Sequence, residues 1–186
     1  MDLREAIYGR RSVREFTAAT VDEKTIRKLI DAAIQAPSAV NEQPWSFAVV
    51  KDKALLSRIS NGAKAFMLQA PPIGLASHHF QELISNPSFD IFYNAPVLIV
   101  IASVTNDHWA VENCALAAEN LMLAACAEGL GTCWIGFAQG WLDTPEGKAA
   151  LRLPMEYKSV APIILGHPKA QPSPVPRREP KIRVIG

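Results

Sequence analysis

The stretch Gly129-Leu130-Gly131-Thr132-Cys133-Trp134-Ile135-Gly136 decides between two fold classes for this chain. Its G-x-G opening matches the start of the glycine fingerprint of dinucleotide-binding folds, but Trp134 stands where the third glycine belongs. That fingerprint follows a strand and opens a helix, whereas this stretch follows a helix-like run and opens a strand-like one. The sequence therefore disfavours a Rossmann fold. We expect the glycines to form a tight helix exit and to let the backbone approach a flat ligand closely.

Outward from this stretch, helix-like and strand-like segments follow one another without a steady βα rhythm. An alanine-rich helix is expected from about Trp109 to Glu128, and Val97–Ile101 is typical of a strand buried on both faces. Further helices are expected at Asp2–Gly9, from a cap at Thr20 or Asp22 to Pro37, and at Ala54–Ile59, Ala63–Gln69, Ser77–Ile84 and Glu146–Leu151; further strands are expected at Trp45–Val50, Thr132–Phe137 and Ser159–Leu165. This mixture favours an α+β fold over a doubly wound α/β fold.

Length and composition limit the function classes. The 186 residues suit one domain, 49% of them are hydrophobic, and 19 Lys and Arg nearly balance 18 Asp and Glu. This balance argues against a general binder of nucleic acids or anionic membranes. Trp109–Leu130 is long enough to span a bilayer, but its charged and amide side chains predict a buried helix of a soluble protein instead. Three cysteines without a CxxC pair, and a charged N-terminus, favour buried, reduced thiols in the cytoplasm.

The composition changes after Gly166. We therefore expect a domain over residues 1–166 and an extended C-terminal arm over residues 167–186. His167–Pro180 contains five prolines and too few apolar residues to build a core of its own. Lys181–Ile185 alternates polar and apolar residues, so it is suited to add to the edge of a sheet. The alternative is a flexible tail.

Two basic segments are candidates for binding phosphate. Arg10-Arg11-Ser12-Val13-Arg14 places three guanidinium groups and a hydroxyl directly after an expected helix end. Arginine keeps its charge and makes forked hydrogen bonds to phosphate oxygens. The later Pro176-Arg177-Arg178 could fold back toward the same phosphate. The alternatives are a solvated basic turn for the first segment and a solubilising patch for the second.

The loop from Ala36 to Trp45 is a candidate for binding a flavin ring. Two prolines bracket it, and it presents Ser38, Asn41 and Gln43. An amide side chain offers both a donor and an acceptor, which suits the alternating carbonyl and N–H groups on the pyrimidine edge of a flavin. The alternative is a loop that only caps a helix and leads into a strand. Trp45 is expected to belong to the core.

Together and in this order, these segments resemble the nitroreductase family of FMN-dependent oxidoreductases. The resemblance rests on RRSVREF (residues 10–16), APSAVNEQPW (36–45), NAPVLIVIA (94–102), EGLGTCWIG (128–136) and the late PRR (176–178). It covers nearly the whole chain and is weakest over Ala54–Phe92, where members of this family differ in substrate. It implies an α+β fold with a central, mostly antiparallel sheet flanked by helices. It also implies an intertwined homodimer with exchanged C-terminal arms and two FMN sites at the interface.

The resemblance implies cofactor-binding roles for individual residues. The phosphate-side segment of the family matches Arg10, Arg11 and Ser12, and its late phosphate ligand matches Arg177 or Arg178. The basic residue beside flavin N1 and O2 matches Arg14. The loop that reaches the flavin, commonly from the partner subunit, matches Pro37, Ser38, Ala39 and Asn41. The backbone segment near flavin N5 matches Ile135 and Gly136, although many members carry Glu-Gly there and this chain has Gly136-Phe137.

The implied activity is hydride transfer from NAD(P)H, by way of FMN, to a flat, electron-poor acceptor that is nitroaromatic- or quinone-like, in a ping-pong scheme. The flavin carries the redox chemistry, so the protein needs no nucleophile or general base of its own. Two rivals stay open: another flavin chemistry on the same fold, such as dehalogenation or dehydrogenation, and a non-catalytic FMN store or redox sensor. No metal site is expected, because His78 and His79 are adjacent rather than at ligand spacing.

Overall fold

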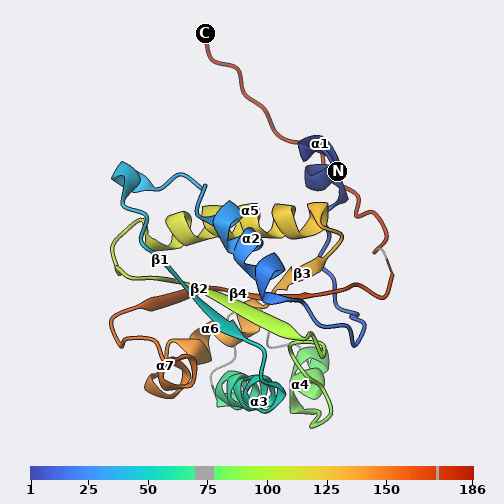
Figure 1. Ribbon diagram of the computed structural model, residues 1–186, viewed down its shortest axis with the longest axis vertical. Coiled ribbons are helices and arrows are strands. Elements are labelled where there is room, and N and C mark those ends of the chain that lie inside the picture. Colours follow the sequence, from blue (N-terminus) through green and yellow to red (C-terminus); the bar gives the residue numbers. More distant parts are fainter. Residues whose placement is uncertain (70–77, 171) are drawn as a thin grey trace.

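The computed structural model describes residues 1–69, 78–170 and 172–186, and an antiparallel sheet lies at its centre (Figure 1). The strands are β1 (Trp45–Val50), β2 (Val97–Ser103), β3 (Gly131–Trp134) and β4 (Lys158–Gly166), in the order β1-β2-β4-β3. Every neighbouring pair of strands is antiparallel. The expected α+β fold with a central antiparallel sheet is therefore confirmed.

The two N-terminal helices and a long helix lie on one face of the sheet. α1 (Leu3–Gly9) and α2 (Glu23–Ala33) begin at Asp2 and Asp22, whose carboxylates accept backbone N–H bonds from the first turn. Of the two expected caps for the second helix, Asp22 is therefore the one used. Both helices pack against the long α5 (Ala110–Ala127), which crosses this face of the sheet (Figure 1). Among the residues that the structure describes, no helix is long and apolar enough to cross a membrane.

Helices α3 (Lys53–Gln69), α4 (His78–Ser85), α6 (Gly136–Leu142) and α7 (Pro145–Leu151) cover the opposite face (Figure 1). The expectation of two separate helices at 54–59 and 63–69 is wrong, because α3 runs unbroken through Gly62. The missing side chain of Gly62 leaves room for the ring of Trp141, which a Cβ would overlap. Pro71 and Pro72, which separate the helices expected at Ala63–Gln69 and Ser77–Ile84, lie outside the described residues.

The strand expected at Thr132–Phe137 is too long. β3 ends at Trp134, and Gly136 and Phe137 open α6. The physical reason is the proline that faces Ile135 in β4. The Ile135 N–H donates to Pro162 O over 2.8 Å, but Pro162 has no N–H to donate in return, and the chain then turns away from the sheet into a helix.

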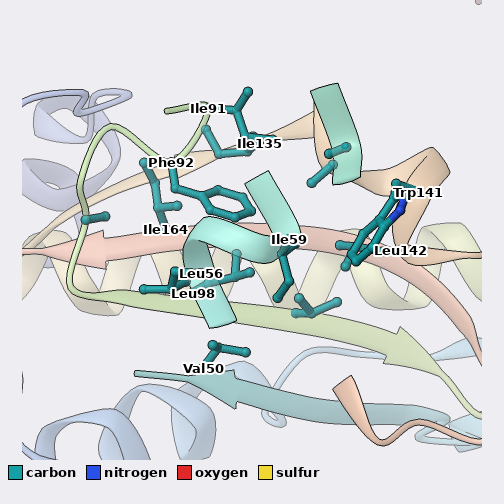
Figure 2. Close-up of a cluster of buried hydrophobic side chains, with 14 of the residues drawn as sticks. Val50, Leu56, Ile59, Ile91, Phe92, Leu98, Ile135, Trp141, Leu142 and Ile164 are labelled. Atoms are coloured by element: carbon teal, nitrogen blue, oxygen red, sulfur yellow. The ribbon is translucent and has the colours of Figure 1, made fainter. Parts of the chain in front are cut away.

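β2 is buried on both faces, as its apolar sequence predicted. Leu98 and Val100 join a cluster with buried side chains of α3, α6 and α7, part of which Figure 2 shows. Val97, Ile99 and Ile101 alternate with them and join a second cluster with α2 and α5. The sheet is thus the middle of three layers, and β1 and β3 are its two edges.

The C-terminal arm carries no helix or strand over residues 172–186. It runs past α1, and its end lies away from the body of the protein (Figure 1). Val184 and Ile185 are 92% and 95% exposed. The sheet-edge pairing expected for Lys181–Ile185 is not made within this chain, and pairing with a second copy stays a prediction.

Candidate cofactor-binding site

The basic segment Arg10–Arg14 runs along the edge of β3. Ser12 and Thr132 form a parallel bridge, and the Val13 N–H donates to Thr132 O over 2.9 Å. Gly131 is required at this crossing, because a Cβ there would lie 2.8 Å from the side chain of Val13. The close backbone approach expected of this glycine-rich stretch is therefore made to the basic segment itself.

A hollow of about 330 Å³, here called the arginine hollow, lies beside this segment. Two stretches far apart in the sequence line it, and they contribute Arg10, Arg11, Ser12, Arg14, Pro172, Ser173, Val175 and Arg177. Four guanidinium groups and a serine hydroxyl make a donor set suited to a phosphate group. Of the two late arginines, Arg177 lines the hollow and Arg178 does not.

The start of the arm explains why the two basic segments meet. The Thr17 N–H donates to His167 O over 2.9 Å, and the Lys169 N–H donates to Glu15 O over 3.0 Å. Between these bonds, Phe16 and Pro168 form an antiparallel bridge. The chain after β4 is therefore fixed alongside residues 15–17 and continues past the arginine hollow.

The arginines of the hollow do not share one environment. Arg10 Nε lies 3.4 Å from the carboxylate of Glu119 on α5. Arg11 Nη1 donates to Tyr8 O over 2.7 Å and to Arg10 O over 2.8 Å, so part of its guanidinium fixes the end of α1. Arg11 Nε is buried without a partner among the described residues. An unpaired charged donor at the wall of a basic hollow is consistent with an anionic ligand.

Two of the three cysteines, Cys126 and Cys133, lie near this site, whereas Cys114 lies at the other end of α5. Burial raises the pKa of the Cys133 thiol, and the neighbouring Arg14 charge and Ser12 hydroxyl only reduce that rise. Burial also raises the pKa of Cys114 to about 12. Both are buried thiols as expected, whereas Cys126 is partly exposed, which corrects the expectation for the third cysteine.

A second hollow of about 290 Å³, here called the tyrosine hollow, shares Arg14 with the first. Its other lining residues are Glu15, Phe16, Ser88, Phe89, Asp90, Tyr93, Asn94 and Lys169. The Arg14 guanidinium lies 5.8 Å from the centroid of the Tyr93 ring. Tyr93 and Asn94 have φ of +54° and +55°, left-handed values that are uncommon outside glycine and often mark functional loops. Apart from Arg14, the residues of this hollow were not predicted to bind the cofactor. The available signal was the polar pair Tyr93-Asn94 directly before the strand-opening Ala95-Pro96.

The proline-bracketed loop lies at the other end of α5 from α1 (Figure 1). The Ala39 N–H donates to Asn113 Oδ1 in the first turn of α5, whereas Arg11 lines a small hollow with Cys126 in its last turn. At ~1.5 Å per residue, Asn113 and Cys126 are about 20 Å apart along the helix. The structure therefore does not bring Pro37, Ser38, Ala39 or Asn41 to the arginine hollow of their own chain. Trp45 packs against the core cluster of α2 and α5, as expected.

Gly136 is exposed at the start of α6, and Ile135 before it is buried. A Cβ at Gly136 would meet nothing within 4 Å, so the packing of this chain does not require glycine there. The first N–H groups of a helix have no partner inside it and are available to an external acceptor. Ile135 cannot offer its N–H in the same way, because that group already bonds to Pro162 O. Of the two expected residues, Gly136 alone presents a free approach to the backbone.

A family model described as "Nitroreductase family" matches residues 7–167 of the chain. A relative from Methanothermobacter thermautotrophicus, whose name carries the terms NADH dehydrogenase and NAD(P)H nitroreductase, is 48% identical over 59 residues. That match covers 32% of this chain and 31% of the relative, so the matched segment spans about a third of the curated relative's length. An iodotyrosine deiodinase from Haliscomenobacter hydrossis is 36% identical over 55 residues, which are 30% of this chain and 25% of that protein.

Among solved structures, the chain is similar to a nitroreductase with bound FMN from Bacteroides fragilis. The TM-score is 0.84 at 25% sequence identity, and the similarity covers 100% of both chains. The likeness therefore includes the C-terminal arm as well as the sheet and its helices.

Proposed function

Since this chain belongs to the nitroreductase family, we propose that it is an FMN-dependent oxidoreductase that takes hydride from NAD(P)H. The observation that carries the proposal is the arginine hollow, in which Arg10, Arg11, Arg14 and Arg177 surround a space that fits one phosphate group. The structural relative obtained with bound FMN supports the same cofactor.

The residues of the two hollows suit the two chemical parts of FMN. The arginine hollow supplies cations for a phosphate, and the tyrosine hollow supplies the Asn94 amide and the Tyr93 ring for the pyrimidine edge of a ring, beside the carboxylates of Glu15 and Asp90. Arg14 lines both, so it would lie between phosphate and ring. Gly136 would offer a bare backbone N–H to the ring, because no side chain covers it.

When bound, FMN would supply the two-electron chemistry, and the protein residues would bind and orient it. Arg14 would stabilise the negative charge that the ring carries when reduced, as a fixed cation beside N1 and O2. Arg10, Arg11, Ser12 and Arg177 would hold the phosphate. Pro37, Ser38, Ala39 and Asn41 would contact the ring of the partner subunit.

A homodimer would complete the site, because one chain does not gather all of its expected residues. None of the loop residues around Ala39 lines the arginine hollow of its own chain, and a second copy would supply them. Exposed apolar side chains on α1 and α5, which include Ile7, Tyr8 and Leu116, are available for this contact.

The acceptor would be a flat, electron-poor compound of the nitroaromatic or quinone class, which could stack in the place that NAD(P)H leaves. The relative named iodotyrosine deiodinase keeps dehalogenation open as another flavin chemistry. A panel of nitroaromatics, quinones and halogenated phenols, offered to the reduced protein, separates these classes by the rate at which each reoxidises the flavin.

We expect the purified protein to be yellow and to release FMN rather than FAD when denatured. The physical reason is that the arginine hollow suits one phosphate group and that the sequence lacks a dinucleotide fingerprint. Chromatography identifies the released cofactor, and anaerobic stopped-flow spectroscopy follows bleaching of the flavin by NADH or NADPH. Recovery of FAD alone, or of no flavin after reconstitution, contradicts the proposal. FMN that neither nucleotide bleaches favours a store or sensor.

We expect Arg177→Ala to weaken FMN binding roughly tenfold to a hundredfold, and Arg178→Ala to leave it nearly unchanged. Arg177 lines the arginine hollow and Arg178 does not, although the two are neighbours in sequence. A hydrogen bond to a charged group contributes about 1.5–3 kcal/mol, which gives this range. Titration of the apoprotein with FMN measures both affinities. Equal losses in the two variants would show that the arm contributes only its general charge.

A further inference from the structure

We propose that Asn113 is a positioning residue, whose side-chain oxygen holds the loop around Ala39 in the shape that contacts the FMN of the partner subunit. The inference rests on the proposed function. It adds a residue of α5 that lies outside every segment that the sequence analysis connected with the cofactor.

Asn113 is a buried amide with an unusual hydrogen-bond balance. It is 2% exposed, and its Oδ1 accepts the N–H of Ala39 over 2.9 Å. Its Nδ2 is buried and has no hydrogen-bond partner among the described residues. Buried side-chain amides are normally paired, and an unpaired donor lowers stability. The one hydrogen bond of the Asn113 side chain among the described residues therefore goes to the loop, and its second polar group adds nothing to stability.

The loop that Asn113 holds has a strained backbone. Val40, Asn41 and Gln43 have φ of +44°, +56° and +53°. Such values are uncommon outside glycine and least favourable for a β-branched residue such as valine. Val40 is 98% exposed, so no burial offsets its strain. Conformations of this kind persist where the surroundings hold them in place, and they concentrate at ligand-binding sites.

The loop closes on itself by its own side chains. The Gln43 N–H donates to Ser38 Oγ over 2.9 Å, and Gln43 Nε2 donates to Asn41 Oδ1 over 3.0 Å. These bonds fix the shape of the loop but not its place on the body of the protein. The bond from Ala39 to Asn113 supplies that place, because it joins the middle of the loop to α5.

Helix α5 also contacts a residue of the arginine hollow. Glu119, further along α5, pairs with Arg10 of that hollow over 3.4 Å. α5 therefore contacts the loop through Asn113 and the arginine hollow through Glu119. Because a helix has a fixed rise per residue, the spacing of these two contacts is fixed as well. In a twofold dimer this arrangement sets the distance at which each loop meets the hollow of the partner.

Three single variants test the role of the Asn113 oxygen. Asn113→Ala should weaken FMN binding about tenfold or more, the size of one lost hydrogen bond with loosening of the loop. Asn113→Asp keeps an acceptor oxygen but buries a carboxyl group, so it is compared with the wild type at a pH that protonates this carboxyl, where it should restore affinity to within about twofold. Asn120→Ala is the matched control, because Asn120 Nδ2 ties α5 to Ala32 O over 3.3 Å and not to the loop.

Fluorescence titration of each dimeric variant with FMN gives the affinities, and thermal unfolding of the apoprotein gives the stabilities. The inference is overturned if Asn113→Asp binds as weakly as Asn113→Ala, or if Asn120→Ala loses as much affinity. If the wild-type protein binds no FMN, that result contradicts the proposed function rather than the role of Asn113.

Mixed dimers test whether the loop acts across the interface. A chain with Asn113→Ala and a chain with Arg10→Ala, carrying different tags, are purified as a pair at an FMN concentration a few times the wild-type Kd. If the loop serves the partner, one site combines an intact hollow with an intact loop, and the pair holds about one FMN. If the loop serves its own chain, both sites are damaged and FMN stays as low as in the two parent variants, which would falsify the proposal.

Discussion

Replacing Arg14 with alanine is expected to slow the reduction of bound FMN by NADH or NADPH about a hundredfold or more and to lower the flavin reduction potential. Arg14 lines both hollows, and its guanidinium lies 5.8 Å from the Tyr93 ring centroid, so the charge has a defined place. Removing one preorganised interaction with a developing charge typically costs a few kcal/mol, which corresponds to this change in rate. Stopped-flow reduction and a redox titration measure the two effects.

Two further variants make the result specific to the position of the charge. Arg4→Ala is the matched control, because the Arg4 guanidinium lies over the Tyr8 ring at 5.5 Å but lines neither hollow. It should leave both rate and potential unchanged. Arg14→Lys keeps a cation and should recover most of the potential. A wild-type potential in Arg14→Ala at full FMN occupancy would show that Arg14 does not lie beside the ring.

The sheet and its core were predictable because their signals are local. The apolar run Val97–Leu98–Ile99–Val100–Ile101 predicted a strand buried on both faces, and the structure places its side chains alternately in the two core clusters. The sequence predicted two helices in place of α3, separated by residues 60–62, and a glycine such as Gly62 weakens a helical pattern. Glycine is required at position 62 because the ring of Trp141, from α6, occupies the space that a side chain would need. Tertiary packing of this kind leaves no mark in the neighbouring sequence.

The candidate site was predictable only in part, for a related reason. The arginines near the N-terminus form a local cluster, so the sequence indicated them directly. The choice of Arg177 over Arg178 depends on the path of the arm, which the bonds between residues 15–17 and 167–169 set. Asn113 lies in an alanine-rich helix and resembles an ordinary helical polar residue until its contact with Ala39 is known. The roles of Arg177 and Asn113 therefore depend on contacts between segments that are distant in the sequence.

The arm is expected to decide both dimerisation and FMN binding, through different residues. Its first half carries Arg177 past the arginine hollow. Its last half exposes Ile182, Val184 and Ile185, which would be poorly placed in water. Of the two sheet edges, β3 is partly covered by the bridge of Ser12 with Thr132, whereas β1 adjoins a separate hollow of about 310 Å³.

That hollow is lined by the apolar side chains of Ile26, Ile30 and Val49 and by the charged side chains of Glu23, Arg27 and Lys51. An alternating segment added to β1 from a second copy would satisfy its backbone groups and bury apolar side chains against this surface. We therefore expect the edge of β1 to receive Lys181–Ile185 of the partner subunit.

Two truncations separate the halves of the arm. A chain ending at Pro180 loses the pairing segment but keeps Arg177, and burial of two aliphatic side chains at about 1.5–3 kcal/mol each predicts a dimer at least about a hundredfold weaker. Its FMN affinity should fall at low protein concentration and recover at concentrations that restore the dimer. A chain ending at Gly166 loses Arg177 as well, so its FMN affinity should stay low even then. Light scattering and flavin titration over a range of protein concentrations measure both quantities. If the chain ending at Gly166 stays dimeric and binds FMN as tightly as the full chain, the arm is a flexible tail and contributes to neither.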